Sequence, residues 1–223
     1  MLHHTSLTFK EELTHRTGLT RVILHHTADS RPHTVEDVHK AQINTGFAGI
    51  AYHYFIRKDG EIYEGRPVWA IGAHTKGYNE DSIGVCFEGD FNKEKMSETQ
   101  LEASVMLLSL LGLAREKEDY DVEICRHDDL VEGKVPSPGK LFPFDELMCR
   151  VNYCQDLLKS LFGEERDHEP WHMDWEARNH YNGMGDDEAV RRRMNAPEYV
   201  WSGNFYYEKI IDLFADIEEE DEF

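Results

Sequence analysis

The chain has 223 residues, 40% of them hydrophobic, which is enough for one domain with a buried core and an extension. Its formal net charge of −20 at pH 7 argues against nucleic acid and anionic membrane surfaces as partners, because both are polyanions. No window approaches the roughly 18 consecutive apolar residues of a membrane helix, so we expect no integral membrane segment. The N-terminus has no basic region followed by an apolar run, which predicts cytoplasmic synthesis without a signal peptide.

Residues 1–20 are polar with scattered hydrophobic side chains, and we expect them to form a short helical or irregular arm. The branched apolar run at residues 22–24 then indicates a buried strand. This run ends abruptly on His25 and His26. A strand end is a rigid place for a metal ligand, because the sheet fixes the backbone while the side chain can face a cleft. The histidine pair is therefore the first candidate for a functional site.

A helix is predicted next, because Thr34 and the acidic residues after it suit a helix N-terminus. It should end near Gly46. Residues 51–57 have the pattern of a second strand, and Asp59-Gly60 is a hairpin signal that leads into a partner strand at residues 61–65.

The loop at residues 66–80 is rich in Gly, His and Asn, a composition typical of a shaped loop at a cleft. Four further elements are predicted: a strand at 82–89, a helix from the capping-box pattern Ser97-Glu98-Thr99-Gln100 to about residue 116, a strand at 121–125 leading to His127, and a helix at 144–162. Strands alternating with helices predict an α/β fold with a central mixed β-sheet flanked by helices.

The four cysteines include no C-x-x-C pair, so no zinc-ribbon spacing is present. Cys86 and Cys125 lie in apolar strand-like runs and are predicted to be buried thiols, which favours a reducing compartment. The composition changes at Gly163, because residues 164–223 contain 18 acidic and 6 basic residues and three of the four tryptophans. We therefore divide the chain into an arm at residues 1–20, a domain at 21–163 and an acidic, aromatic-rich extension at 164–223.

Several short phrases occur in a defined order along the domain. They are Leu24-His25-His26-Thr27-Ala28, Tyr52-His53-Tyr54, Asp59-Gly60, Tyr63-Glu64-Gly65-Arg66, Gly72-Ala73-His74-Thr75-Lys76-Gly77-Tyr78-Asn79, Ser82-Ile83-Gly84-Val85, His127-x-Asp129 and Pro138-Gly139. Together they resemble the zinc-dependent N-acetylmuramoyl-L-alanine amidases, a family that includes bacteriophage lysozyme-type amidases and the peptidoglycan recognition proteins. The resemblance covers about residues 20–160 and implies the fold of that family.

The resemblance implies that His25 and His127 are zinc ligands. The residue types agree, because neutral imidazoles at two strand ends can converge on one ion and leave a position for water. Tyr52 matches the family's catalytic tyrosine, which would donate a hydrogen bond to a developing oxyanion. The other interpretation of Tyr52 is a strand aromatic in the core. Lys134 lies near the position of the family's lysine, displaced by one residue, and is a candidate catalytic residue or else a solvated loop lysine.

The third implied ligand departs from the family pattern. The family places cysteine, or in some branches aspartate, immediately before Pro-Gly, and this chain has Ser137. A serine hydroxyl is neutral at pH 7 and binds zinc poorly. Three outcomes are open: Ser137 ligates weakly, Asp128 or Asp129 replaces it, or the site holds no metal.

The loop residues His74, Thr75 and Asn79 match the family's groove loop, and the resemblance implies that they bind the sugar and peptide of a muramyl peptide. The implied function is zinc-dependent hydrolysis of the amide between N-acetylmuramic acid and L-alanine in peptidoglycan. The alternative is a non-catalytic peptidoglycan-binding protein that has lost the third ligand. The enzyme would reach the wall after release or non-classical export. The extension at 164–223 would act as a flap, a wall-binding element or a contact for a protein partner, and its acidity favours the flap or the protein partner.

Overall fold

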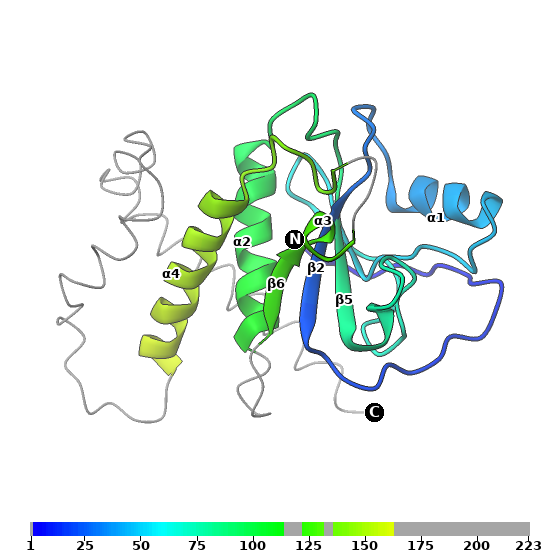
Figure 1. Cartoon of the computed structure of the whole chain (residues 1–223), viewed down its shortest axis with the longest axis horizontal. Helices are drawn as coiled ribbons and strands as arrows, with labels where there is room; N and C mark the ends of the chain where they lie inside the picture. The colour runs from blue at the N-terminus through cyan, green and yellow to red at the C-terminus, as the bar shows by residue number, and fades with distance from the viewer. Residues whose placement is uncertain (1, 114–121, 132–135, 163–223) are drawn as a thin grey trace. The chain divides into compact units, whose positions relative to one another are not determined.

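The computed structural model describes residues 2–113, 122–131 and 136–162. The strands are β1 (Leu2–His3), β2 (Arg21–His26), β3 (Tyr54–Ile56), β4 (Ile62–Glu64), β5 (Ser82–Phe87) and β6 (Glu123–Arg126). The helices are α1 (Val35–Asn44), the 3-10 turn η1 (Asn79–Asp81), α2 (Glu98–Leu113), α3 (His127–Leu130) and α4 (Phe144–Phe162). Figure 1 labels α1, α2, α3 and α4 together with β2, β5 and β6. Lys134 and the predicted extension lie outside the described residues, and the predicted boundaries at residues 20 and 163 remain predictions.

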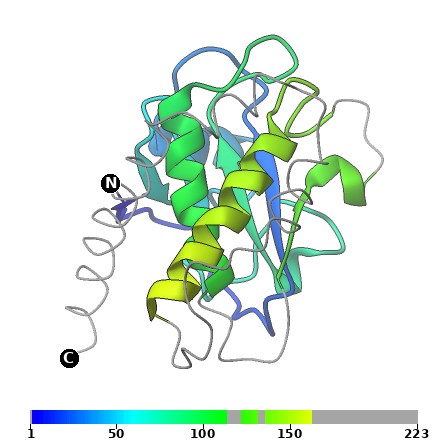
Figure 2. The same ribbon diagram turned by 90° about the vertical axis from the view of Figure 1, so that its left-hand side faces the viewer.

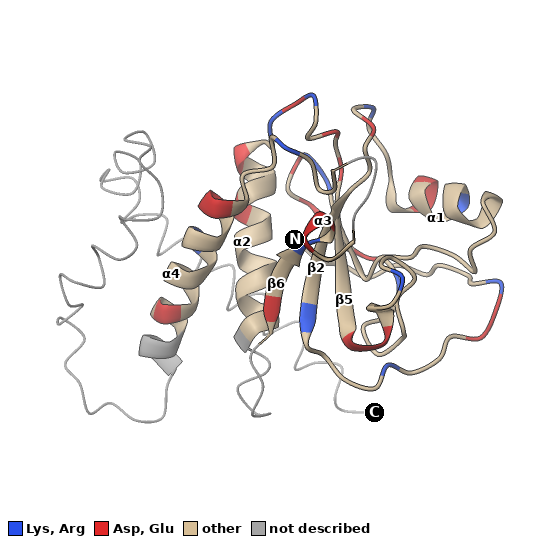
Figure 3. Ribbon diagram, viewed as in Figure 1, with Lys and Arg blue, Asp and Glu red and all other residues tan. Residues whose placement is uncertain are grey.

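The six strands form one sheet in the order β1-β4-β3-β5-β2-β6. Only β3 and β4 pair in the antiparallel direction, and the other neighbours are parallel. The predicted mixed sheet flanked by helices is therefore confirmed. Strands β2 and β5 carry no charged residue except Arg21, which begins β2 (Figure 3). Uncharged sequences of this kind are typical of parallel strands that are buried on both faces.

The chain divides into two compact units, one of residues 1–104 and 114–143, and one of residues 105–113 and 144–223. The first unit contains the whole sheet. In the described part of the second unit, α4 lies beside the C-terminal half of α2 (Figure 2). The Ser109 hydroxyl there donates to the Val151 carbonyl, at 3.4 Å between the oxygens. Leu147, Val151 and Leu158 are buried along α4 at a spacing typical of one helix face.

Helix α1 begins where the sequence predicts. The Thr34 side chain accepts from the backbone N–H of Asp37, and the Asp37 carboxylate accepts from the backbone N–H of Thr34, which completes a capping box. Val35 at the start of the helix packs with Ile50, Phe55 and Cys86 in a buried cluster.

The predicted capping box of α2 forms only in part. The Ser97 hydroxyl accepts from the backbone N–H of Gln100 at 3.2 Å. The Gln100 side chain does not return to residue 97, because its amide donates to the carbonyls of Ile56 and Glu88, at 3.0 Å each. Gln100 thus ties the helix start to the ends of β3 and β5 instead of capping the helix.

Three segments differ in extent from the prediction. The strand predicted at residues 51–57 is shortened to β3, and its partner to β4, although the turn at Gly60 forms with a positive φ of 85°. The N-terminal arm contributes β1, which pairs with β4 at the sheet edge. None of the four cysteines forms a disulfide, and Cys86 and Cys125 are buried as predicted. Among the described residues, no helix is long and apolar enough to cross a membrane.

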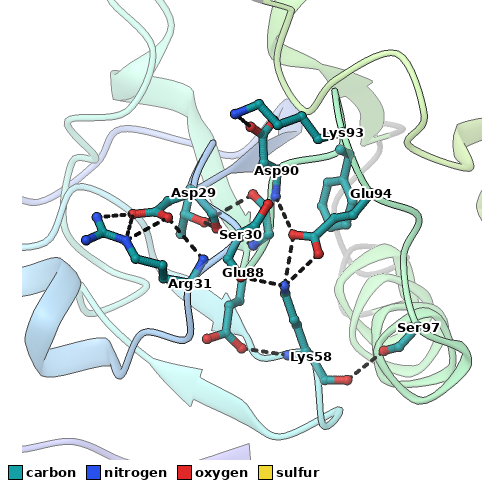
Figure 4. A network of polar contacts seen from close by, with 12 residues as sticks. Asp29, Ser30, Arg31, Lys58, Glu88, Asp90, Lys93, Glu94 and Ser97 are labelled. Carbon is teal, nitrogen blue, oxygen red and sulfur yellow. Dashed lines mark hydrogen bonds and ion pairs between the residues drawn. The ribbon is translucent and has the colours of Figure 1, made fainter.

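A polar network fixes the edge of the sheet at which β2, β3 and β5 end (Figure 4). Glu88 is only 1% exposed and accepts from the backbone N–H groups of His33 and Lys58. The Lys58 ammonium donates to the Ser30 carbonyl at 3.0 Å and to both carboxylate oxygens of Glu94 at 2.8 and 2.9 Å. Glu88 and Lys58 thus join the segments that follow β2, β3 and β5. The ends of these three strands are therefore held together.

Candidate functional site

The structure brings His25 and His127 together, 102 positions apart in the chain. β2 and β6 are parallel, and their pairing runs from Arg21 with Glu123 to Leu24 with Arg126. The next residue on each strand is therefore His25 on β2 and His127 beyond β6. Parallel neighbours lie about 4.8 Å apart, and the two imidazole centroids are 5.0 Å apart. His127 does not end the strand as predicted, because it is the first residue of α3.

Both imidazoles are held in their neutral form. Burial, followed by the neighbouring His127 and His26, lowers the pKa of His25 well below its ordinary value. Burial also lowers the pKa of His127, although the carboxylate of Asp128 opposes the effect. Neutral imidazole is the form that binds zinc. Both rings therefore have the protonation state that a nitrogen ligand of zinc requires at pH 7.

Each ring of the pair has one nitrogen that makes no hydrogen bond to the residues that the structure describes. The buried Nδ1 of His127 has no hydrogen-bond partner among the described residues. The hydrogen bonds of His25 to described residues all involve Nε2, so its Nδ1 is also without one. Two open nitrogen donors on adjacent rings fit part of a zinc site, which takes imidazole nitrogen at about 2.0–2.1 Å.

Tyr52 lies beside the histidine pair, with its ring centroid 5.1 Å from that of His25. Cys86 and Gln42 lie close enough to its phenol to affect the pKa, and the ring packs against the buried cluster of Val35, Ile50, Phe55 and Cys86. Burial, followed by Cys86, raises the pKa of Tyr52 above its ordinary range. The phenol therefore keeps its proton and remains a donor. The ring therefore packs on the core beside His25, and the catalytic role of Tyr52 remains a prediction.

The loop residues also gather at the pair. The Nδ1 of His74 lies 3.1 Å from the Nε2 of His25 and 2.9 Å from the hydroxyl of Thr75. The Asn79 carboxamide oxygen accepts from the backbone N–H groups of His74 and Thr75, at 2.9 and 2.8 Å. Asn79 thus holds the loop in shape, and Thr75 is only 1% exposed. The predicted contacts of these three residues with a substrate remain predictions.

The third-ligand position is near α3. The Ser137 carbonyl accepts from the backbone N–H of Asp128 at 3.0 Å, and its hydroxyl makes no hydrogen bond to a described residue. Asp129 is already paired with Arg126, at 2.6 Å between Oδ1 and Nη2. In the part of the chain that the structure describes, no group of three or more His, Cys, Asp and Glu side chains could hold a metal ion. The described residues therefore offer two histidine donors, with the hydroxyl of Ser137 as the predicted third.

The motifs in the sequence predict no site role for Ser82, Gly84 and Cys86, which face the site from β5. Residues 82, 84 and 86 alternate onto one face of that strand, and Cys86 is paired with His25. The Ser82 hydroxyl lies 3.4 Å from the Nε2 of His74. The alternation of side chains between the two faces of this strand was the sequence signal that could have located these three residues.

The arrangement defines an α/β protein with a histidine-lined site at the ends of parallel strands. Comparison with known proteins gives the class a name. Residues 15–140 match the family model described as N-acetylmuramoyl-L-alanine amidase. The chain therefore belongs to the N-acetylmuramoyl-L-alanine amidase family, as the sequence motifs predict.

Relatives of two kinds are similar to this chain. The endolysin of Escherichia phage T7 is 36% identical over 124 residues, which cover 53% of this chain and 81% of the endolysin. Peptidoglycan recognition protein 3 of Mus musculus is 38% identical over 98 residues, but these cover 44% of this chain and only 27% of that protein. The similarity to the mouse protein thus concerns a part of it.

Solved structures agree with this assignment. The N-acetylmuramoyl-L-alanine amidase LysC from Clostridium intestinale has a TM-score of 0.62 at 31% identity, covering 68% of this chain and 97% of LysC. An ectodomain complex of peptidoglycan recognition proteins LCa and LCx bound to tracheal cytotoxin has a TM-score of 0.54 at 33% identity, covering 60% of this chain and 84% of that one. The fold is shared by enzymes and by recognition proteins.

Proposed function

We propose that this protein hydrolyses the amide between N-acetylmuramic acid and L-alanine in peptidoglycan, with zinc held by His25 and His127. The observation that carries the proposal is the meeting of two neutral imidazoles, the buried ring of His25 and the half-buried ring of His127, each with an Nδ1 that makes no hydrogen bond to the described residues, next to the Tyr52 ring. The family membership and the endolysin relatives support the same reaction. Action on the wall would follow synthesis in the cytoplasm and release or non-classical export.

Each residue of the site has a separate role in the proposed reaction. His25 and His127 bind the metal through nitrogen, and Ser137 completes the ligand set with its neutral hydroxyl. When bound, zinc supplies a Lewis acid and an activated water near pH 7. Tyr52 keeps its proton because burial raises its pKa, so it can donate a hydrogen bond to the oxygen on which negative charge develops. Lys134, outside the described residues, remains a candidate for a second charge-stabilising group.

Purified full-length protein with a muramyl-L-alanyl peptide tests this proposal. We expect about one zinc per chain, release of the free amine of L-alanine, loss of the reaction with a chelator and its return when zinc is added. His25→Ala should abolish both zinc binding and cleavage. His15→Ala is the matched control, since this exposed histidine stacks on Trp69 away from the pair. Full cleavage in the presence of chelator would contradict the zinc-dependent reaction.

One observation favours a second function, a peptidoglycan-binding protein without catalysis. Ser137 replaces an anionic ligand, and among the residues that the structure describes no three-residue His, Cys, Asp or Glu cluster replaces it. Two imidazoles and a hydroxyl should hold zinc less tightly than a set with a thiolate. Binding of the muramyl peptide in the calorimeter, with no amine released at saturating zinc, would establish this alternative.

A further inference from the structure

The ring of His74 is held in a slot that is built for it. A Cβ atom on Gly84 would lie 2.5 Å from the Cδ2 and Cγ atoms of His74, and one on Gly72 would lie 2.5 Å from its Cδ2. His53 contacts the same ring edge-to-face, with centroids 5.7 Å apart. Gly72, Gly84 and His53 thus enclose a space that matches the shape of the His74 ring. Because the orientation of the ring is fixed, the two ring nitrogens of His74 make hydrogen bonds in defined directions.

The hydrogen bonds of this ring determine where its proton lies. The Ser82 hydroxyl donates to the carbonyl of Tyr78, so toward the Nε2 of His74, 3.4 Å away, it can act only as an acceptor. His74 therefore carries its proton on Nε2. The described groups that hydrogen-bond this ring belong to His25, Thr75 and Ser82, and none of them is a carboxylate that would hold a second proton on the ring. The Nδ1 of His74 is consequently an acceptor.

Because the Nδ1 of His74 is an acceptor, only one tautomer of His25 is consistent with the distances around it. The two nitrogens that face each other, His74 Nδ1 and His25 Nε2, are 3.1 Å apart, and two lone pairs at this distance would repel. The Thr75 hydroxyl lies 2.9 Å from the first nitrogen and 3.3 Å from the second. Whether His25 donates to His74 directly or to Thr75, its proton is on Nε2.

We propose that His74 is a positioning residue that fixes the tautomer of His25, with the proton on Nε2 and the lone pair of Nδ1 presented to the site. Metal-binding histidines commonly donate their second ring N–H to a carboxylate, a carbonyl or water. Here a neutral imidazole, oriented by Ser82, takes that place. The consequence for zinc affinity rests on the proposed function, whereas the tautomer itself does not.

The direct test is the protonation pattern of His25 in metal-free protein. Long-range ¹H–¹⁵N correlation spectra of ¹⁵N-histidine-labelled full-length protein at pH 7.5 distinguish a protonated Nε2 from a protonated Nδ1. The ring of His25 is assigned by the signals that are missing in His25→Asn. We expect a single form with the proton on Nε2. A proton on Nδ1 of His25 in the wild-type protein would overturn the proposal, and this measurement needs no folded variant of His74.

Three variants test the causal role of the ring. His74→Phe removes the acceptor, and Gly84→Ala forces the ring out of its slot, so both should give His25 a mixture of tautomers. Thr75→Val, the matched control, removes the neighbouring hydroxyl and leaves the acceptor, so His25 should keep its proton on Nε2. An unchanged His25 in both His74→Phe and Gly84→Ala, with folding verified by the remaining spectrum, would refute the proposal.

Zinc affinity provides the functional readout and separates the two proposals. By comparison with other residues that orient metal ligands, His74→Phe should weaken zinc binding by about 10- to 100-fold in a competition titration with a chromophoric chelator. If wild-type protein binds no zinc but His25 has the expected tautomer, the zinc-dependent function fails and the positioning role stands. Equal zinc affinity in wild type and His74→Phe would overturn the claim that the positioning serves the metal.

Discussion

The buried imidazole of His53 should make the stability of this protein depend on pH. His53 is fully buried, its Nε2–H donates to the Ala70 carbonyl, and its Nδ1 accepts from the Gly84 N–H, both at 2.9 Å. Burial is the largest cause that lowers the pKa of His53 from 6.5 to about 4. The unfolded chain takes up a proton near pH 6.5, but the folded protein resists it until about pH 4. Stability contributed by the neutral ring is therefore present above pH 6.5 and is lost as the pH falls from 6.5 to 4.

The size of the effect follows from the gap between the two pKa values. Each pH unit inside that window removes up to about 1.36 kcal/mol, so a change from pH 7 to pH 4.5 should lower the free energy of unfolding by about 2.5 kcal/mol through His53 alone. His53→Gln keeps a donor and an acceptor but has no group that titrates in this range. The variant should lose about 2.5 kcal/mol less than the wild type over the same interval.

Urea unfolding followed by far-UV circular dichroism at the two pH values measures this difference. The other histidines are common to both proteins, so their contributions cancel except for that of His74, whose ring contacts His53. An NMR titration of the His53 ring in the folded protein is the independent check. Equal losses in wild type and His53→Gln, or protonation of His53 near pH 6.5 in the folded state, would refute the reasoning.

Three further predictions concern the site and the polar network around Glu88. Ser137→Cys supplies an anionic thiolate and should raise zinc affinity at least about tenfold in a chelator competition; an unchanged affinity would show that position 137 does not face the ion. Tyr52→Phe should lower kcat for the muramyl peptide by about 10²- to 10³-fold with unchanged zinc affinity, and full activity would assign Tyr52 to the core alone. Glu88→Ala leaves the backbone N–H groups of His33 and Lys58 without their acceptor and should destabilise the fold by about 2–4 kcal/mol in urea unfolding. A loss below about 0.5 kcal/mol would show that water replaces the carboxylate.

The sequence predicts well those parts of the site that regular structure determines. His25 follows a buried strand, and His127 follows another, and parallel pairing in register brings such positions to neighbouring places. Helix α1 is predicted correctly because its capping box is local, confined to Thr34 and Asp37.

The positions that the sequence does not predict depend on contacts between distant segments. Nothing near Gln100 indicates that its amide donates to Ile56 and Glu88 instead of closing a capping box. Glu88 resembles a solvated acid at a strand end, and only the backbone N–H groups of two other loops explain why it is buried. The side chain of His74 is directed in part by Gly84 in the strand beside it, which no pattern within its own loop reveals.

The position of β2 inside the sheet has a consequence for how the site can evolve. β2 is paired on both sides, with β5 and β6, whereas β6 is the last strand of the sheet and leads directly into α3. The half of the site on β2 thus tolerates little change in backbone length, while insertions or deletions between His127 and Ser137 would leave every strand in register. New ligand chemistry in descendants of this protein, or in redesigned versions of it, should therefore enter through the segment between His127 and Ser137 and not through the sheet.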